Sequence, residues 1–454
     1  MPARTLSKTA TTTGSILLPS RQKPSAETHS RPSTPSLHAT ASRPGATLKK
    51  LTSEIRWFNL GVVTITPLLS IYGLCTTKLC KATIVLAFLC YVVNMFAITA
   101  GYHRLWSHRS YKASIPLQYF LAIAGAGAVQ GAIRWWARNH RSHHRYTDTD
   151  LDPYDARKGF WYTHIGWMLV KPKITPGRCD VRDLSQNKVV QWQRKYYFPL
   201  ALVTGILVPW FIPGYFWGDW RGGLFIAGFA RITMTHHSVF CVNSLAHWLG
   251  DSPYDDKHTP RDHLLTAILT LGEGYHNFHH QFPMDYRNAV KWYQYDPTKW
   301  MIWALAHLRL ASHLQRFPEN EIRKGQLAMS LKKLKVEQDS ISWPTKSDDL
   351  PVISWESFKE ESRTRSLVLV AGFIHDVSEF VDRHPGGREL LEKSLGTDCT
   401  ASFFGGVYEH SNAAHNLLST MRVGALHGGL EQVDPNAIAP GQRLYIAESV
   451  ASTR

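Results

Sequence analysis

Cysteine is scarce in this sequence, and the few thiols are scattered. The chain has no CxxC pair among its six cysteines, which are Cys75, Cys80, Cys90, Cys179, Cys241 and Cys399. This distribution argues against a thiolate metal site and against a secreted disulfide framework, and it fits a reducing or membrane-embedded setting. A GxGxxG fingerprint is also missing, so no flavin or dinucleotide site is evident.

Acidic residues are outnumbered along the chain. Among 454 residues, 51 Lys and Arg stand against 35 Asp and Glu, which gives a formal net charge of +16. Such a charge would suit nucleic acid, but no nucleic-acid-binding motif accompanies it. The basic residues flank long apolar segments, so attraction to an anionic membrane face is the better account, and we predict no nucleic-acid partner.

The first 50 residues contain almost no acid and very little apolar sequence. They hold 17 Ser and Thr, 6 Pro and 8 Lys and Arg against one acid, Glu27. Such a segment cannot bury enough apolar surface to offset its ordering entropy, so we predict a disordered, basic tail over 1–50. The composition also fits a transit peptide, although the apolar patch at 16–19 is short for one.

Four segments are long and apolar enough to be considered as membrane spans, at 57–74, 83–101, 198–217 and 222–242. Each is interrupted by Pro or polar residues, and a soluble protein could bury any one of them as a core helix. A fifth apolar stretch, 117–133, is expected to lie within or against the bilayer without crossing it. Four crossings place the basic tail and every histidine cluster on one side, which the charge marks as cytosolic.

Histidine is abundant and clustered. Eight of the 23 histidines lie in three boxes, "HRLWSH" (103–108), "HRSHH" (140–144) and "HNFHH" (276–280). In an α-helix, residues i, i+3 and i+4 share one face, so each HxxHH box directs at least two imidazoles the same way. One such box is usually a polar helix face, whereas three beside apolar spans indicate metal ligands.

The number and type of ligands suggest which metal binds. Eight or nine imidazoles exceed what one ion accepts, so two neighbouring ions are expected. Neutral imidazole suits iron, copper, zinc and nickel. Structural zinc would favour thiolates, and soluble di-iron carboxylate sites use Glu with Glu-x-x-His pairs. Neither pattern occurs here, and we predict iron.

The segments "GYHRLWSHRSYKA", "ARNHRSHHRYTDTDLDPYDARKGFWYTHIGWMLV", "CVNSLAHWLGDSPYDD" and "GEGYHNFHHQFPMDYRN" resemble the membrane-bound acyl-CoA Δ9 (stearoyl-CoA) desaturases. The likeness covers roughly residues 55–310. It implies a mainly α fold: four transmembrane helices with a cytosolic helical cap. The HRLWSH box and the NxxxH element distinguish this branch from histidine-box hydroxylases and from front-end desaturases.

The resemblance implies a nine-histidine di-iron site, with one further contact from Asn243 through water. The nine ligands are His103, His108, His140, His143, His144, His247, His276, His279 and His280. No role is assigned to His164, His236, His237 or His263, which match no trusted motif.

Substrate contacts follow from the same resemblance. A CoA group on the cytosolic face, with its acyl chain in a kinked tunnel, would meet Asn59, Arg138, Asn139 and Lys171. Arg and Lys suit its phosphates, although both residues also fit simple membrane-surface charges. Asn139 stands where mammalian members have Asp, Gly131 where they have Asn, and Phe240 where they have Trp.

The implied reaction is an oxygen-dependent dehydrogenation that forms a cis double bond in a saturated palmitoyl or stearoyl chain and releases two waters. Alkyl C–H bonds do not ionise usefully, so the metal must carry the chemistry. A histidine-box hydroxylase, or a desaturase of another lipid, is the alternative. A haem-bearing electron carrier with structural zinc and a transporter are more remote possibilities.

A second domain is expected near the C-terminus. Residues 51–315 would form the desaturase domain, 316–347 a helix fading into a linker, 348–428 a soluble domain with a short strand in "SLVLVAGFIHDV", and 429–454 a tail. "FIHDVSEFVDRHPGGRELL" and "YEHSNAAHNLL" resemble a cytochrome b5 domain, a small α+β fold that binds haem b. His384 and His410 match its two axial ligands, with His415 as the rival of His410.

The C-terminal position of this domain is that of fungal acyl-CoA Δ9 desaturases. Two protein ligands leave no place for O2 on the haem, which can then only pass electrons. Tethering raises the local donor concentration, and the acidic domain would be drawn to the basic catalytic face. NADH would enter through a separate NADH–cytochrome b5 reductase. We predict a multi-pass protein of the endoplasmic reticulum membrane with both termini cytosolic.

Overall fold

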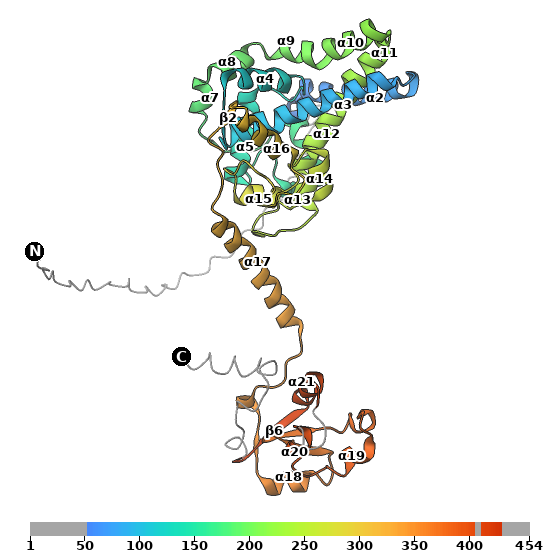
Figure 1. Cartoon of the computed structure of the whole chain (residues 1–454), viewed down its shortest axis with the longest axis vertical. Coiled ribbons are helices and arrows are strands. Elements are labelled where there is room, and N and C mark those ends of the chain that lie inside the picture. Colours follow the sequence, from blue (N-terminus) through green and yellow to red (C-terminus); the bar gives the residue numbers. More distant parts are fainter. Residues whose placement is uncertain (1–51, 405–409, 429–454) are drawn as a thin grey trace, which may run out of the picture.

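Helices dominate most of the chain, and a small sheet follows them. The computed structural model describes residues 52–404 and 410–428. The predicted tails at 1–50 and 429–454 lie outside the described residues. The expected combination of a mainly α unit with a small α+β domain at the C-terminus is confirmed (Figure 1).

The N-terminal unit contains the apolar helices and the histidine boxes. Its longer elements are α2 (Trp57–Thr76), α3 (Lys81–Phe96), η1 (Ala97–Ser107), α4 (Ile115–Ala126), α5 (Ile133–Tyr146), α8 (Lys188–Lys195), α10 (Val208–Trp217), η5 (Gly223–Ala230), α12 (Arg231–Asn243) and α16 (Pro297–His307). α9 (Tyr197–Leu202) and η4 (Val203–Leu207) run directly into α10. Shorter elements are β1 (Lys112–Ala113), η2 (Ala156–Lys158), η3 (Tyr162–Gly166), α6 (Trp167–Leu169), α7 (Arg182–Gln186), α11 (Trp220–Gly222), α13 (Leu245–Trp248), α14 (Leu264–Leu269), α15 (His276–Gln281) and β2 (Ala311–Ser312). β1 and β2 pair antiparallel.

Three helical stretches are long and apolar enough to cross a membrane: Trp57–Thr76, Lys81–Ser107 and Tyr197–Trp217. They correspond to three of the four predicted spans. The fourth predicted span, 222–242, is also helical, in η5 and α12. This helix is not apolar enough to count as a candidate span. α4, in the fifth stretch, is apolar and shorter than a span.

Polar residues inside the helix formed by η5 and α12 explain its lower apolar character. Arg231 is buried, and its guanidinium donates to the Asn94 side chain and to the carbonyl oxygens of Gly127 and Gly205. One arginine therefore joins this helix to α3, to the end of α4 and to η4. Because its donors are satisfied inside the bundle, the charge does not face lipid.

The C-terminal domain is built on a four-stranded sheet in the order β3-β6-β5-β4. Its elements are η6 (Ser347–Asp349), β3 (Val352–Ile353), α18 (Trp355–Glu361), β4 (Leu367–Val370), β5 (Phe373–Asp376), η7 (Val381–Arg383), α19 (Arg388–Glu392), α20 (Thr400–Phe403), α21 (Asn412–Thr420) and β6 (Arg422–Leu426). The predicted single strand in "SLVLVAGFIHDV" is wrong, since β4 and β5 form a hairpin there. Ala371 and Gly372 both have positive φ, as two-residue hairpin turns require.

The two faces of this sheet carry different layers. Phe358 of α18 packs with Leu367 and Leu369 on one face. On the other, Val368 and Val370 contact side chains from the segments that follow His384, among them Leu391, Phe403 and Leu418. All four residues of β4 are buried because both faces are covered.

A buried histidine in this sheet makes the stability of the domain depend on pH. Burial, reinforced by the charge of Arg422, lowers the pKa of His375 to about 3. The unfolded chain, with a pKa near 6.5, then binds the proton first, so stability is lost as pH falls below 6.5. Between pH 7 and 5 we expect a loss of about 2 kcal/mol.

Hydrogen exchange of the β4 and β5 amides in the full-length chain measures this loss. His375→Gln removes the titrating group and should abolish the pH dependence over this range. Equal pH slopes in the two proteins would contradict the assignment.

The two units are joined by α17 (Glu319–Ser340), a helix of 22 residues. Its first turns pack on the N-terminal unit, where Ile322 is buried with Tyr254, Phe278 and Phe282. Beyond them α17 leads away to the C-terminal domain (Figure 1).

Candidate metal and haem sites

The first histidine box lies in a π-helical segment. α3 continues into η1, and the His108 amide donates to the carbonyl of His103, five residues earlier. In an α-helix, residues five apart point about 140° away from each other. The wider π turn brings such residues onto one side of the helix. His103 and His108 can therefore face the same cluster.

The third box lies on the short helix α15, whose first turn is fixed by buried groups. The Asp262 carboxylate accepts the backbone N–H groups of Asn277 and Phe278, at 2.9 and 3.2 Å. A carboxylate is favourable there because it satisfies amides that lack helical partners. The Asn277 side-chain oxygen also accepts a hydrogen bond from the Tyr254 backbone N–H, and the Phe278 side chain is buried. The two residues between the histidines thus anchor the box.

The structure gathers all nine predicted histidines into two compact groups. The first group contains His103, His108, His140, His144 and His279, and the second contains His143, His247, His276 and His280. Each HxxHH box is split in the same way: the residues four apart stay together, and the middle histidine joins the other group. The groups are adjacent, since the rings of His144 and His280 stack at 4.1 Å.

The Nε2 atoms of these rings converge. In the first group, the Nε2–Nε2 distances are 2.9 Å for His103–His279, 2.8 Å for His108–His140 and 2.9 Å for His144–His279. In the second, they are 3.2 Å for His143–His280, 3.0 Å for His247–His276 and 3.1 Å for His276–His280. Two nitrogens about 2.1 Å from one ion, at right angles to each other, would be about 3.0 Å apart. The spacing fits ligands around two ions.

Three of the rings have their other nitrogen held by a polar partner, a carboxylate in two cases and a hydroxyl in the third. His103 Nδ1 lies 2.6 Å from Glu273, and His143 Nδ1 lies 2.9 Å from Asp152. His247 Nδ1 donates to Thr259 Oγ1 at 2.7 Å, because the Thr259 hydroxyl donates its own proton to Asp148. A protonated Nδ1 leaves the Nε2 lone pair available for a metal.

Burial favours the neutral form of most of the nine imidazoles. It lowers the pKa of His140, His144, His247, His276, His279 and His280 well below 6.5, and neighbouring histidines lower it further. Neutral, buried nitrogens that face one another lack counter-charge and suit a cation. The donor set is therefore that of a transition-metal site.

Glu273 belongs to a buried ionic network behind the first group. Arg104 contacts Glu273 at 2.9 Å and Asp296 at 2.9 Å, and all three side chains are buried. Burial alone would raise the pKa of Glu273, but attraction to His103 and Arg104 outweighs it and lowers the pKa to about 2. The sequence analysis did not identify Glu273, Asp152 or Thr259. Arg104 in the first box and Glu273 in "GEG" before the third box are charged residues that could have indicated this network.

Other residues singled out in the sequence lie near this centre. Asn243 is half-buried at the end of α12, four residues before His247, and its contact through water stays a prediction. His164 and His237, which match no box, bond each other at 3.0 Å, and His164 bonds Ser244 at 2.8 Å. His236 donates to backbone carbonyls, and His263 lies beside Thr266.

In the C-terminal domain, each of the two histidines predicted as haem ligands has one ring nitrogen bonded to the backbone. His384 Nδ1 donates to the carbonyl of Gly387, and His410 Nδ1 donates to that of Phe403, at 3.2 and 3.0 Å. A proton on Nδ1 makes Nε2 the basic nitrogen of each ring. A Cβ on Gly386 would lie 2.8 Å from the His384 ring, and Gly387 has a φ of +97°, so both glycines are needed for this turn.

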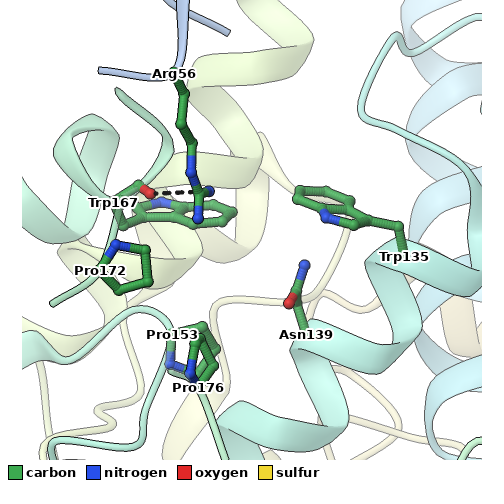
Figure 2. Close-up of a pocket in the computed structure, with 7 residues that line it drawn as sticks. All are labelled: Arg56, Trp135, Asn139, Pro153, Trp167, Pro172 and Pro176. Atoms are coloured by element: carbon green, nitrogen blue, oxygen red, sulfur yellow. Dashed lines mark hydrogen bonds between the residues drawn. The ribbon is translucent and has the colours of Figure 1, made fainter. Parts of the chain in front are cut away.

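A pocket opens close to the metal-site helices (Figure 2). It is lined by Arg56, Trp135, Asn139, Pro153, Trp167, Pro172 and Pro176. The Trp135 and Trp167 indoles are nearly parallel, with centroids 6.4 Å apart, and the Arg56 guanidinium donates to the carbonyl oxygen of Trp167 at 3.5 Å. Trp167 in turn contacts Tyr154, whose ring is 4.9 Å from that of His143.

The four predicted substrate residues are placed differently. Asn139 lines the pocket. Asn59 donates to the carbonyl of Met168, and Lys171 donates to that of Ser53, so both tie the start of α2 to the α6 region. Arg138 is exposed on α5. Sequence reasoning missed Arg56, Trp135 and Trp167, and a Trp–Trp–x–x–Asn run before the second box was the signal.

Comparison with known proteins agrees with this geometry. Residues 82–317 match the family described as "Fatty acid desaturase". A "Probable acyl-CoA desaturase" of Schizosaccharomyces pombe is 48% identical over 387 residues, which are 85% of this chain and 80% of the relative. The chain belongs to the fatty acid desaturase family.

Further relatives and a second family match agree with this assignment. "Acyl-CoA desaturase 1" of Saccharomyces cerevisiae is 45% identical over 84% of this chain and 75% of its own length. "Stearoyl-CoA desaturase 5" of Homo sapiens is 40% identical over 62% of this chain and 88% of its own length. Residues 354–427 match the "Cytochrome b5-like Heme/Steroid binding domain", which implies haem. The chain is thus a histidine-box desaturase fused to a haem domain.

Proposed function

We propose that this chain is an acyl-CoA Δ9 desaturase that introduces a cis double bond into palmitoyl- or stearoyl-CoA. The observation that carries the proposal is the convergence of nine imidazoles, six buried and three half-buried, in two adjacent groups, in a chain whose relatives are named as acyl-CoA and stearoyl-CoA desaturases. Formation of one double bond removes two hydrogens from the acyl chain. Together with two electrons and two protons, they reduce O2 to two waters.

The metal is proposed to be a pair of iron ions, one held by each histidine group, with Asn243 approaching through water. Such a centre would supply the oxidising power that unactivated C–H bonds require. The protein's part is positional. Glu273, Asp152 and Thr259 orient three imidazoles, while Asp262 holds α15 in place. The side chains around the site would hold the acyl chain so that one C–C bond faces the ions.

The electrons are proposed to arrive through haem b held by His384 and His410, reduced by a separate NADH–cytochrome b5 reductase. We place the protein in the endoplasmic reticulum membrane, crossing it four times with both termini in the cytosol. The fourth crossing would be the helix formed by η5 and α12, with Arg231 sealed inside the bundle. The proposed division is a desaturase domain at 51–315, a linker at 316–347 and a haem domain at 348–428.

Lipid analysis tests the reaction. Expression in a host that lacks its own Δ9 desaturase should restore palmitoleate and oleate. A hydroxylated lipid would instead support a histidine-box hydroxylase, and zinc without non-haem iron would support a haem-bearing electron carrier. Either result would overturn the proposal.

The pocket of Figure 2 is the proposed seat of the CoA group, because indoles suit a planar or alkyl surface and Arg56 suits phosphate. Arg56→Ala should raise KM for acyl-CoA about tenfold, since a charge-assisted hydrogen bond contributes roughly 1.5–3 kcal/mol. Steady-state kinetics measures this change. Arg182→Ala is the matched control, because Arg182 is exposed and pairs with Asp180 outside the pocket. An unchanged KM in Arg56→Ala would remove Arg56 from the site.

A further inference from the structure

The short helix α14 has an outer side that is apolar and exposed. Leu264, Leu265 and Ile268 are 59%, 54% and 48% exposed, and the sequence from 264 to 272 carries no charge. Thr266 and Ala267, on the inner side, are fully buried. Exposed apolar patches of this kind often mark contact with a membrane or a protein. The helix lies outside the four predicted spans and directly before the third histidine box.

The contacts of α14 with α3 show how far along the span it lies. The Tyr91 hydroxyl of α3 donates to the carbonyl oxygen of Leu269, the last residue of α14. Leu271 is buried in a cluster with Tyr91 and Met95. At about 1.5 Å per residue, Tyr91 and Met95 lie roughly 15 and 21 Å along the helix from Lys81, the first residue of the span.

Polar and aromatic side chains mark the Lys81 end of the span as a membrane boundary. The Thr83 hydroxyl donates to the Asp219 carboxylate, and the Trp217 indole donates to the Thr83 hydroxyl. Charged groups and indoles gather in this way where helices leave the hydrocarbon core. The core is about 30 Å thick, so Tyr91 and the carbonyl that it binds lie near its middle.

The backbone at the deep end of this segment has protein partners. The Leu269 carbonyl accepts the Tyr91 hydroxyl, and the Leu271 carbonyl accepts both the backbone N–H and the hydroxyl of Thr298. Inside a bilayer no water satisfies such groups, so a segment that turns there must find its partners in the protein. The turn after α14 therefore meets the requirement for a segment that enters the bilayer and returns.

A second contact places α16 near the opposite boundary of the core. The hydroxyls of Thr298 and Thr99 are 2.8 Å apart, and Thr99 lies roughly 27 Å along the helix from Lys81. Trp300 and Trp303 follow on α16 and are 43% and 52% exposed. Indoles are enriched at the membrane–water boundary, where one end of the ring is in an apolar setting and the other is in water. The two tryptophans lie at that depth.

We propose that α14 is a re-entrant segment whose apolar side is immersed in the hydrocarbon of the bilayer, with Trp300 and Trp303 at the level of the lipid headgroups. The partner is the acyl region of the phospholipids in the leaflet next to the histidine groups. The inference rests on the proposed crossing of the bilayer by α3. It goes beyond the four proposed crossings, because it places the chain between the fourth crossing and the third histidine box partly inside the membrane.

Immersion of α14 fixes the position of the third histidine box relative to the membrane. The His263 N–H donates to the carbonyl of Gly274, and a Cβ on Gly274 would lie 2.1 Å from the backbone nitrogen of Ala267. The backbone of α14 is therefore in direct contact with the segment that leads into α15. Since His276 follows Gly274 closely, the bilayer holds the box at the membrane surface.

Photolabelling of the full-length chain, loaded with iron and haem in phosphatidylcholine vesicles, tests the immersion. An apolar aryl diazirine dissolved in the bilayer should label α14 and the α16 indoles to an extent similar to the exposed Leu68 of α2, as mapped by mass spectrometry. Leu331 of α17 is the matched internal control. It is 57% exposed on a helix that leads away from the desaturase unit, and it should stay unlabelled (Figure 1).

Each other labelling pattern counts against the inference. Label on α2 without label on α14 would overturn it and leave the proposed crossing intact. Absence of label from α2 as well would remove the crossing, and the immersion with it. Equal label on α14 and Leu331 would show that the reagent binds any exposed apolar helix, and protection of α14 that dilution reverses would assign the surface to a second copy of the chain.

A charge substitution provides a measurement that does not depend on the reagent. Leu265→Lys should lower the temperature of thermal unfolding in the same vesicles by several degrees, because a charged side chain is costly in hydrocarbon. Leu331→Lys, at a leucine of similar exposure, should leave this temperature unchanged. Equal unfolding temperatures in the two variants would place α14 in water.

Discussion

Replacing His279 by alanine is expected to abolish desaturation. Its Nε2 atom lies 2.9 Å from both His103 Nε2 and His144 Nε2, so it sits at the centre of the five-histidine group. Its loss removes a ligand that no nearby side chain can replace, and it leaves a cavity among neutral imidazoles. In the complemented host, unsaturated fatty acid should fall to background. Elemental analysis should find less than one non-haem iron per chain.

The matched control is His307→Ala, since His307 is exposed on α16 and bonds only within its own helix. It should leave both the lipid profile and the iron content unchanged. Normal unsaturated lipid in the His279 variant would contradict the ligand assignment. Lost activity with full iron would show that His279 acts in some other way.

The second large effect is expected for Glu273→Gln. The change removes the charge that holds the Nδ1 proton of His103 and leaves Arg104 paired with Asp296 alone. Loss of a carboxylate partner of a metal-binding histidine typically costs 10–100-fold in metal affinity. Disruption of a buried ionic pair costs about 3–5 kcal/mol of stability. Iron titration of the metal-depleted protein, together with thermal unfolding, measures the two effects separately.

Asp152→Asn removes the corresponding carboxylate from beside His143 Nδ1. It should weaken binding of the ion held by the four-histidine group. Glu319→Gln, at an exposed pair on α17, should alter neither property. If Glu273→Gln binds iron as the wild type does, the carboxylate does not orient His103.

Helical periodicity was sufficient to predict part of the metal centre. It predicted that each HxxHH box points at least two imidazoles the same way, and the structure groups His140 with His144 and His276 with His280. It did not predict which group the middle histidines would join, because that depends on how α5 and α15 face each other. Nor did it predict that His103 and His108 share a face, which requires the π-helical turn of η1.

Other differences arise from tertiary contacts that composition does not reveal. Arg231 counted against the fourth span, yet its guanidinium is satisfied by neighbouring helices. The turn at Ala371 and Gly372 was hidden inside an apolar run that read as one strand. The pocket around Arg56 joins residues more than 100 positions apart in the sequence, so no local pattern could predict it.

The division of each HxxHH box between the two groups has a consequence for assembly. α5 and α15 each send ligands to both groups, so the first ion to bind would stiffen the helices that the second ion needs. The second ion then meets ligands whose freedom has already been lost and should bind more tightly. Binding of the two ions would be cooperative, and molecules with one ion would be rare. A substitution on α5 or α15 that changes the affinity of one ion site would also change the affinity of the other.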